Sequence, residues 1–290
     1  MKPSLAIVGC GTVGTAMGKL LSDAGYRVMG VVSRRLETAR KAARTIGVST
    51  YSTNPWEVTK EADIIFITTP DKAITPTCEA IVNHKGFKKG AVVIHCSGAH
   101  SSDILSSARR LEAYVASLHP LQSFASVDQA LKIVHGSVCT IEGDEPALHV
   151  VRQLVSDLGG ILVEISPKGK TLYHAAAVTA SNYLVTLIDM ALQLNGAIGI
   201  ARETSFKALF PLIKGTLKNI EAIGIPAALT GPIARGDIDT VTDHLNAIKK
   251  DVPELIPLYK TLGLFTVNIA VAKGTLSPEI AHKMALLFKE

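Results

Sequence analysis

The sequence has few cysteines, and none of them forms a pair typical of a disulfide framework or a zinc knuckle. Four occur in 290 residues, and no two are separated by the two residues of a CxxC motif. Single, widely spaced cysteines are typical of proteins kept in a reducing compartment. We therefore expect a cytoplasmic protein without a metal site. The four are Cys10, Cys78, Cys96 and Cys139.

We also expect no signal peptide. The apolar run near the start, SLAIVG, is too short for the core of a signal and leads into glycines instead of a cleavage site. Only Thr171–Ile188 approaches the length of a membrane span, and it contains His, Ser, Asn and several Thr. We interpret this stretch as a helix buried in a protein core or a subunit interface, and expect no membrane partner.

Charge of one sign is not concentrated anywhere in the chain. Thirty Lys and Arg residues against 25 Asp and Glu residues give a formal net charge of +5, and the basic residues are scattered. A nucleic-acid-binding protein normally gathers them into a patch or stripe, so we expect no nucleic-acid partner. A mild positive bias instead suits a small anionic substrate.

Glycines occur where a dinucleotide-binding turn needs them. The run GCGTVG follows an apolar segment, Leu5–Val8, and precedes a helical pattern. Gly9 allows a tight turn, Gly11 lets a pyrophosphate approach the backbone, and Gly14 permits close packing of helix on strand. The start of the helix supplies free N–H groups to the phosphates. The residues predicted to bind the cofactor here are Gly9, Cys10, Gly11, Thr12, Val13 and Gly14.

The end of the next predicted strand indicates which dinucleotide binds. An NAD site usually has Asp or Glu there, whereas this sequence has Ser33, Arg34 and Arg35. A hydroxyl and guanidinium groups can bind a 2′-phosphate that a carboxylate would repel. We therefore predict NADP(H) as the cofactor. The alternative is that both arginines only begin a solvated amphipathic helix.

Further apolar runs predict an α/β fold with a doubly wound, mainly parallel sheet. They are ADIIFITTP, GAVVIHCSGAH, EAYVASLHPLQSF, GSVCTIEG and GILVEIS, which extend the sheet to about residue 166. In such sheets ligands bind at the carboxyl ends of the strands. Thr68, Thr69 and Pro70 are therefore predicted to contact the cofactor. The residues predicted to contact the substrate are Ser97, Gly98, His119 and Gln122, although Ser97 and Gly98 could only form a turn and His119 could only cap a strand.

Helical periodicity replaces this alternation in the second half of the chain. We predict a nucleotide-binding domain over 1–166 and a helical substrate-binding and dimerisation domain over 167–290. The stretch TGPIARGD, Thr230–Asp237, breaks the helical pattern, with Asp237 placed to cap the helix that follows. Helices are predicted over 170–196, 203–223, 237–250, 253–273 and 277–289.

Five motifs, GCGTVG, HCSGAH, LHPLQSF, YHAAAVTASNYL and LTGPIARGD, together resemble those of a known group of dehydrogenases. Its members join a Rossmann domain to a helical domain of the 6-phosphogluconate dehydrogenase type, and include ketopantoate reductase and pyrroline-5-carboxylate reductase. The sequence is most similar to a branch of NADP oxidoreductases whose helical domain has no known function. This resemblance covers the whole chain.

The resemblance implies catalytic residues at the start of the helical domain. Ketopantoate reductases carry a catalytic Lys there, with Asn residues four and eight positions later. His174 falls on the Lys position, Val178 on the first Asn position and Asn182 on the second. Ser181 lies on the same helix face as His174. Lys170, one turn earlier, is the alternative proton donor.

Two functions are consistent with these features. The first is an NADPH-dependent reductase of a small carboxylated carbonyl compound, such as the 2-keto acid ketopantoate, or of an imine such as pyrroline carboxylate. The second is a non-catalytic NADP-binding regulator. In the reductase, Ser97, Thr230 and Arg235 would hold the carboxylate. The related reductases also imply a homodimer formed through the helical domain.

Overall fold

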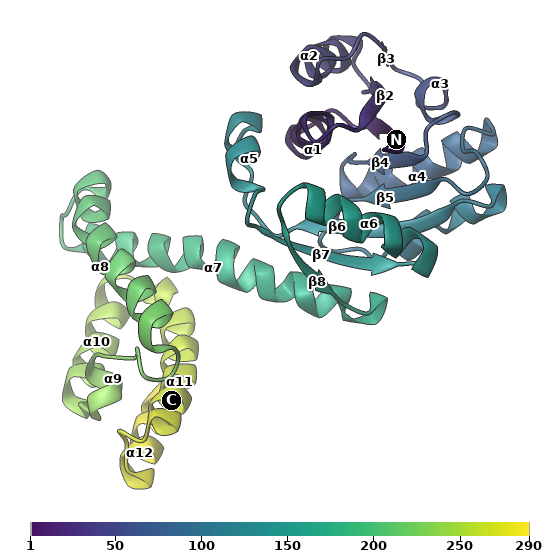
Figure 1. Ribbon diagram of the computed structural model, residues 1–290. Coiled ribbons are helices and arrows are strands. Elements are labelled where there is room, and N and C mark those ends of the chain that lie inside the picture. The colour runs from purple at the N-terminus through teal and green to yellow at the C-terminus, as the bar shows by residue number, and fades with distance from the viewer. Residues whose placement is uncertain (1, 290) are drawn as a thin grey trace. The chain divides into compact units, whose positions relative to one another are not determined.

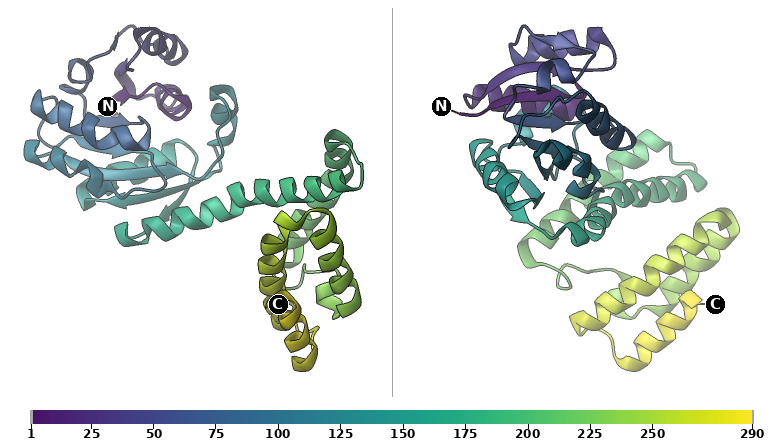
Figure 2. Two further views of the ribbon diagram at one scale, coloured as in Figure 1. Left: turned by 180° about the vertical axis from the view of Figure 1, so that it is seen from behind. Right: turned by 90° about the vertical axis from the view of Figure 1, so that its right-hand side faces the viewer.

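The computed structural model describes residues 2–289 and shows a chain of two compact units (Figures 1 and 2). The first ends at Ala180 and the second begins at Ser181. This division falls inside one continuous helix, α7 (Lys170–Ala197). The last strand of the sheet ends at Glu164, and the chain is helical from Pro167 onward. The predicted boundary after residue 166 thus marks the change of secondary structure, whereas the compact units part 14 residues later.

Eight strands of the first unit form one sheet, in the order β3-β2-β1-β4-β5-β6-β7-β8. Neighbouring strands are parallel, except that β6 and β7 are antiparallel. The predicted fold class, an α/β protein with a mainly parallel, doubly wound sheet, is confirmed. The strands are β1 (Ser4–Val8), β2 (Arg27–Val32), β3 (Tyr51–Ser52), β4 (Ile64–Ile67), β5 (Val92–His95), β6 (Tyr114–Pro120), β7 (Val138–Gly143) and β8 (Ile161–Glu164).

Helices cover both faces of this sheet, because alternate strand residues point to opposite faces and both sets are apolar. Leu5 and Ile7 pack with α1, α2 and α6 on one face, and Ala6 and Val8 pack with α3, α4 and η1 on the other. The bounds are α1 (Thr12–Asp23), α2 (Leu36–Ile46), α3 (Trp56–Thr59), α4 (Asp71–Asn83), η1 (Ser102–Leu111), α5 (Val127–Ile133), α6 (Glu145–Asp157) and η2 (Pro167–Gly169).

The second unit is helical, as predicted. Its core lies between α10, α11 and α12, where Val241, Val267 and Met284 are buried together. Asp237 caps α10, since its carboxylate accepts from the amide of Thr240 at 3.1 Å. The helices are α7 from Ser181 on, α8 (Arg202–Ile223), α9 (Pro232–Arg235), α10 (Ile238–Asp251), η3 (Pro253–Leu255), α11 (Ile256–Lys273) and α12 (Pro278–Lys289).

Two helical segments, Pro167–Ala197 and Pro253–Lys273, are long and apolar enough to cross a membrane by length and composition. Core helices of other folds pass the same test. Burial in a core, one of the two interpretations of Thr171–Ile188, is wrong for α7, in which Leu172 is 78% exposed and Val185 is 66% exposed. The other interpretation, a subunit interface, stays a prediction.

Candidate functional site

The glycine turn after β1 has the geometry that its spacing predicts. Gly9 has φ +110°, which a side chain would strain, and a Cβ there would lie 2.6 Å from the carbonyl carbon of Thr68. A Cβ on Gly14 would lie 2.0 Å from the Gly9 carbonyl oxygen. By contrast, a Cβ on Gly11 would meet nothing within 4 Å. Two glycines therefore let the turn pack closely, and the third leaves its outer surface open.

The start of α1 fits the phosphates of a dinucleotide. The amide of Thr15 donates to the carbonyl of Gly11 at 3.0 Å, so the amides before it have no place in the helical ladder. The first turn of α1 contains no acidic residue that would repel an anion. Beside it, the buried hydroxyl of Thr69 has no hydrogen-bond partner among the described residues. Open backbone, free amides and a spare hydroxyl are what a dinucleotide requires.

Thr68 holds this turn together. Its hydroxyl donates to the carbonyl of Gly9 at 2.6 Å, so the donor is already used within the protein. Ser33, Arg34 and Arg35 follow β2, where the second strand of such a sheet reaches the adenosine ribose. Both arginines are exposed, and no carboxylate occupies their place. The direct contacts predicted for Thr68 to Pro70 and for Ser33 to Arg35 stay predictions.

A row of buried polar side chains crosses the sheet from β5 to β7. Ser117 of β6 lies between His95 of β5 and Glu142 of β7 in the strand register. Cross-strand neighbours project from the same face of a sheet. All three are at most 1% exposed. The otherwise apolar sheet therefore carries an imidazole, a hydroxyl and a carboxylate side by side, at the carboxyl end of β5 and the middle of β6.

Helix α7 adds a cation to this row. Lys170, its first residue, is 1% exposed, and its ammonium donates to the Ser117 hydroxyl at 2.6 Å. Burial lowers the pKa of Lys170, while the charge of Glu142 raises it. A buried ammonium is tolerated only with compensating groups around it. The predicted alternative donor is thus enclosed in the protein.

Two histidines converge on the loop after β5. A Cβ on Gly98 would lie 2.8 Å from both His119 Nε2 and His174 Nδ1, so both imidazoles touch the space above this glycine. His119 Nδ1 is 2.9 Å from the hydroxyl of Tyr173. His174 Nδ1 is buried and has no hydrogen-bond partner among the described residues. His119 Nε2 and His174 Nδ1 therefore approach the same space, and His119 is held there through its other ring nitrogen.

The loop after β5, which contains Gly98, also lies beside the loop after β4 and through it is connected to the glycine turn. His100 Nε2 lies 3.8 Å from Asp71 Oδ2, and Asp71 begins the helix that follows Thr68–Pro70. The nucleotide turn, the β4 loop and the β5 loop are therefore consecutive neighbours. Ser97 shapes the last of them, because its hydroxyl accepts from the amides of Ala99 and His100 at 3.2 and 3.4 Å. The turn-forming role considered for Ser97 is observed.

Burial sets the charge of the two strand histidines. Desolvation, together with the smaller effect of the nearby Lys170 charge, lowers the pKa of His95 to about 3. Desolvation likewise lowers the pKa of His119 to about 4, with smaller effects of Lys170 and His174 in the same direction. Both imidazoles are therefore neutral at pH 7. Lys170 is the cation placed among them.

The other predicted residues lie on exposed segments of the chain. Gln122 is exposed after β6. Ser181 and Asn182 are exposed on α7, Thr230 is exposed just before α9, and Arg235 is exposed at the end of α9, all in the second unit. Their roles as catalytic or substrate-binding residues stay predictions.

Sequence reasoning missed four residues of the site, namely His95, Ser117, Glu142 and Tyr173. A signal for two of them was present: Ser117 and His119 are two apart in one buried strand, and so are Thr140 and Glu142 in the next. Alternate polar residues in a buried strand share a face and need a partner there. That pairing depends on strand order, which the pattern alone does not specify.

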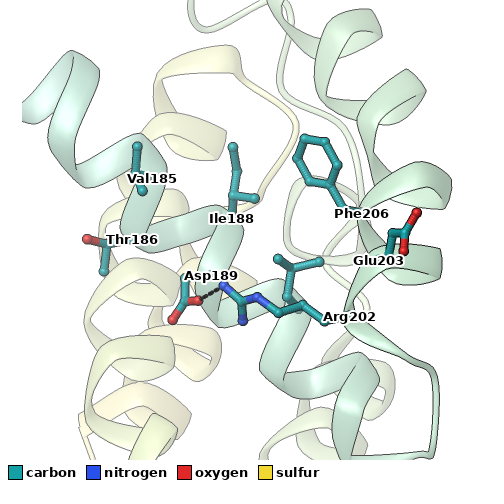
Figure 3. Close-up of a pocket in the computed structure, with 8 residues that line it drawn as sticks. Val185, Thr186, Ile188, Asp189, Arg202, Glu203 and Phe206 are labelled. Atoms are coloured by element: carbon teal, nitrogen blue, oxygen red, sulfur yellow. Dashed lines mark hydrogen bonds and ion pairs between the residues drawn. The ribbon is translucent and has the colours of Figure 1, made fainter. Parts of the chain in front are cut away.

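The second unit has a cavity of its own, of about 790 Å³, between α7 and α8 (Figure 3). Asp189 and Arg202 form an ion pair of 2.5 Å at its edge. Apolar side chains make up much of the rest, and no imidazole or thiol lines it. The lining residues are Val185, Thr186, Ile188, Asp189, Leu192, Arg202, Glu203 and Phe206.

Known proteins share both halves of the chain. Residues 1–120 match the family model of a Rossmann-like domain, and residues 137–266 match that of a domain of unknown function, DUF2520. No curated protein matches the sequence. Together the two family matches account for most of the chain and for both units described above.

Solved structures share the fold over nearly the whole length. Protein TM1727 from Thermotoga maritima is 27% identical with a TM-score of 0.74, over 93% of this chain and 99% of that one. BF3122 from Bacteroides fragilis, a proposed NADP oxidoreductase, is 22% identical with a TM-score of 0.72, over 90% and 96% of the two chains. A pyrroline carboxylate reductase from Plasmodium falciparum, solved with NADP bound, is 15% identical with a TM-score of 0.55, over 99% and 98%. The chain therefore combines a Rossmann-like domain with a DUF2520 domain.

Proposed function

We propose that the protein is an NADPH-dependent oxidoreductase that reduces a small carboxylated carbonyl compound, best represented by a 2-keto acid such as ketopantoate. The observation that carries this proposal is the convergence of His119 and His174 on Gly98, beside a turn built for a dinucleotide. The fold shared with structures named as oxidoreductases supports it.

NADPH, when bound, supplies the hydride to the carbonyl carbon. In this proposal the free amides at the start of α1 hold the pyrophosphate, and Ser33, Arg34 and Arg35 hold the 2′-phosphate. His174 gives its proton to the carbonyl oxygen, which becomes the alcohol, and takes another from solvent. His119, neutral and held by Tyr173, orients the acceptor. The buried ammonium of Lys170 stabilises the negative charge that develops on that oxygen.

The same ammonium favours a carbonyl over an imine as the acceptor. An imine is reduced most readily as a cationic iminium, which Lys170 repels, whereas a carbonyl gains negative charge as the hydride arrives. The decisive test is NADPH oxidation with a panel of 2-keto acids and cyclic imines, each against a cofactor-only control. Turnover of a keto acid supports the proposal. Turnover of imines alone assigns an imine reductase, and tight NADPH binding without any turnover assigns a regulatory protein.

NADPH should bind more tightly than NADH. Arg34 and Arg35 are exposed and offer guanidinium donors where an NAD site has an acid. The double variant Arg34→Ala/Arg35→Ala should therefore bind NADPH at least about tenfold more weakly and NADH nearly unchanged, because only NADPH carries the 2′-phosphate. Titration of both cofactors by calorimetry measures this. An equal loss for both would show that the arginines are only surface charge.

We also propose that the protein is a cytoplasmic homodimer joined through its second unit, without membrane or nucleic-acid partners. Large apolar side chains there are exposed in the single chain, including Tyr183 at 57% and Phe210 at 46%. Apolar surface of this kind normally becomes an interface, and most soluble oligomers are symmetric dimers. Light scattering at micromolar concentration should give the mass of two chains.

Val185→Asp places a charge on this apolar surface and should shift the protein toward monomers. Lys249→Asp, an exposed substitution on α10, is the control and should leave the dimer intact. A monomeric parent protein would contradict the proposal, and recovery of the protein in the membrane fraction would assign the apolar helices to lipid.

A further inference from the structure

The buried carboxylate of Glu142 has no part in the chemistry proposed above, yet it lies next to the groups that do. It projects from β7, the strand that runs antiparallel to its neighbour β6, and it is 1% exposed. Carboxylates are almost never buried to this degree without a charged or hydrogen-bonded partner. The two sets of contacts that Glu142 makes indicate what it does.

The first set fixes the loop that carries Gly98. One oxygen of Glu142 accepts from the amide of Ser102 at 2.8 Å, and the other accepts from the Ser102 hydroxyl at 2.8 Å. Ser102 is the first residue of η1, directly after the loop that follows β5. Both carboxylate oxygens are therefore engaged at one end of this loop. Its other end is tied by the amide of Ser97, which lies 3.1 Å from His95 Nδ1.

The second set concerns charge. Glu142 is directly opposite Ser117 in the strand register, and Ser117 accepts from Lys170 at 2.6 Å. The titratable groups that interact with Lys170 come from four elements. They are His95 and Cys96 from β5 and its end, His119 from β6, Glu142 from β7 and Tyr173 from α7. Of these, His95 and His119 are neutral at pH 7, and burial raises the pKa values of Cys96 and Tyr173. Glu142 is the member of this set that carries a negative charge.

We propose that Glu142 is the positioning residue of this site, which holds the ammonium of Lys170 by its charge across Ser117 and fixes the Gly98 loop through Ser102. One carboxylate thereby links the buried cation to the loop that the two histidines contact. Its role in turnover rests on the proposed function, whereas its effect on Lys170 does not.

Glu142→Gln separates the two contacts. The amide can still accept from the Ser102 amide and donate to the Ser102 hydroxyl, so the loop keeps its bonds while the charge is lost. Without that charge the ammonium form of Lys170 is less favoured. We expect the Lys170 titration, followed by NMR of the labelled lysine Cε and assigned with Lys170→Met, to move down by about one pH unit. Glu145→Gln removes an exposed carboxylate paired with Arg152 at 2.9 Å and should leave the titration unchanged.

Unfolding in urea gives a second measurement that does not depend on turnover. Removing one charge of a buried pair leaves the other charge buried without a partner, which destabilises the fold. Removing both charges removes that destabilisation. Glu142→Gln should therefore lower the unfolding midpoint, and Glu142→Gln/Lys170→Met should raise it again above that of Glu142→Gln. If Glu142→Gln alone does not fold, folding of the double variant Glu142→Gln/Lys170→Met would give the same evidence.

With an active enzyme, Glu142→Gln should move the alkaline limb of the kcat/KM profile to lower pH in step with Lys170. An unchanged Lys170 titration together with additive unfolding midpoints would overturn the proposal and leave Glu142 as a cap for η1. A shifted titration in a protein that turns over no substrate would support the role of Glu142 and count against the reductase alone.

Discussion

His174→Ala should lower kcat by at least about a hundredfold while leaving NADPH affinity unchanged, because a positioned acid contributes about that much or more to a proton transfer. His174 Nδ1 is buried, lacks a partner and touches the space above Gly98, whereas the nucleotide turn lies on other loops. The loss should therefore appear in the chemical step, which single-turnover measurement of NADPH oxidation isolates.

Lys170→Met is the informative comparison, since Lys170 is the other donor that the sequence offers. Its ammonium is enclosed and bonded to Ser117, so we expect it to act by charge and His174 to remain the donor. His149→Ala, an exposed histidine of α6, is the control and should have no effect. If Lys170→Met abolished NADPH oxidation and His174→Ala left its rate unchanged, Lys170 and not His174 would be the proton donor.

Gly14→Ala should abolish NADPH binding and lower the free energy of unfolding by about 1–3 kcal/mol or more, the usual cost of overpacking. The added Cβ would lie 2.0 Å from the Gly9 carbonyl oxygen and 2.2 Å from the Thr68 hydroxyl oxygen. The Gly9 oxygen belongs to the backbone, and the Thr68 hydroxyl is held against it by a hydrogen bond. Neither oxygen can move away without opening the turn. Stability and NADPH binding should therefore be lost together. Urea unfolding and NADPH titration measure the two losses.

Gly11→Ala is the matched variant in the same turn. Gly11 has φ −76°, which any residue adopts, and a Cβ there would meet no atom within 4 Å. Stability should therefore change by no more than about 0.5 kcal/mol, while NADPH should bind more weakly because the methyl group occupies the surface reserved for the pyrophosphate. Parent-like NADPH affinity in Gly11→Ala would show that no dinucleotide approaches this turn.

Much of the fold follows from short-range sequence. The predicted helix over 203–223 is observed as Arg202–Ile223, and that over 277–289 as Pro278–Lys289, because local periodicity and capping residues set helix ends. The GCGTVG turn forms as expected, because its glycines are needed for close contacts with neighbouring residues of the turn and with the end of one adjacent strand. Gly98 and His119, predicted from their places at strand ends, do lie against each other, because parallel strands of one sheet end at the same edge.

The chemistry of the site was decided by the tertiary structure. Ser117 and Glu142 are neighbours only because β7 pairs antiparallel with β6, and the periodicity of a strand does not reveal its partner or direction. Lys170 lies at the start of a predicted helix, and only the fold shows that it is enclosed, because α7 begins beside the polar row on β5, β6 and β7. The sequence determined which residues could do chemistry. Strand order and direction decided which of them share a buried, low-dielectric space where their charges act on one another.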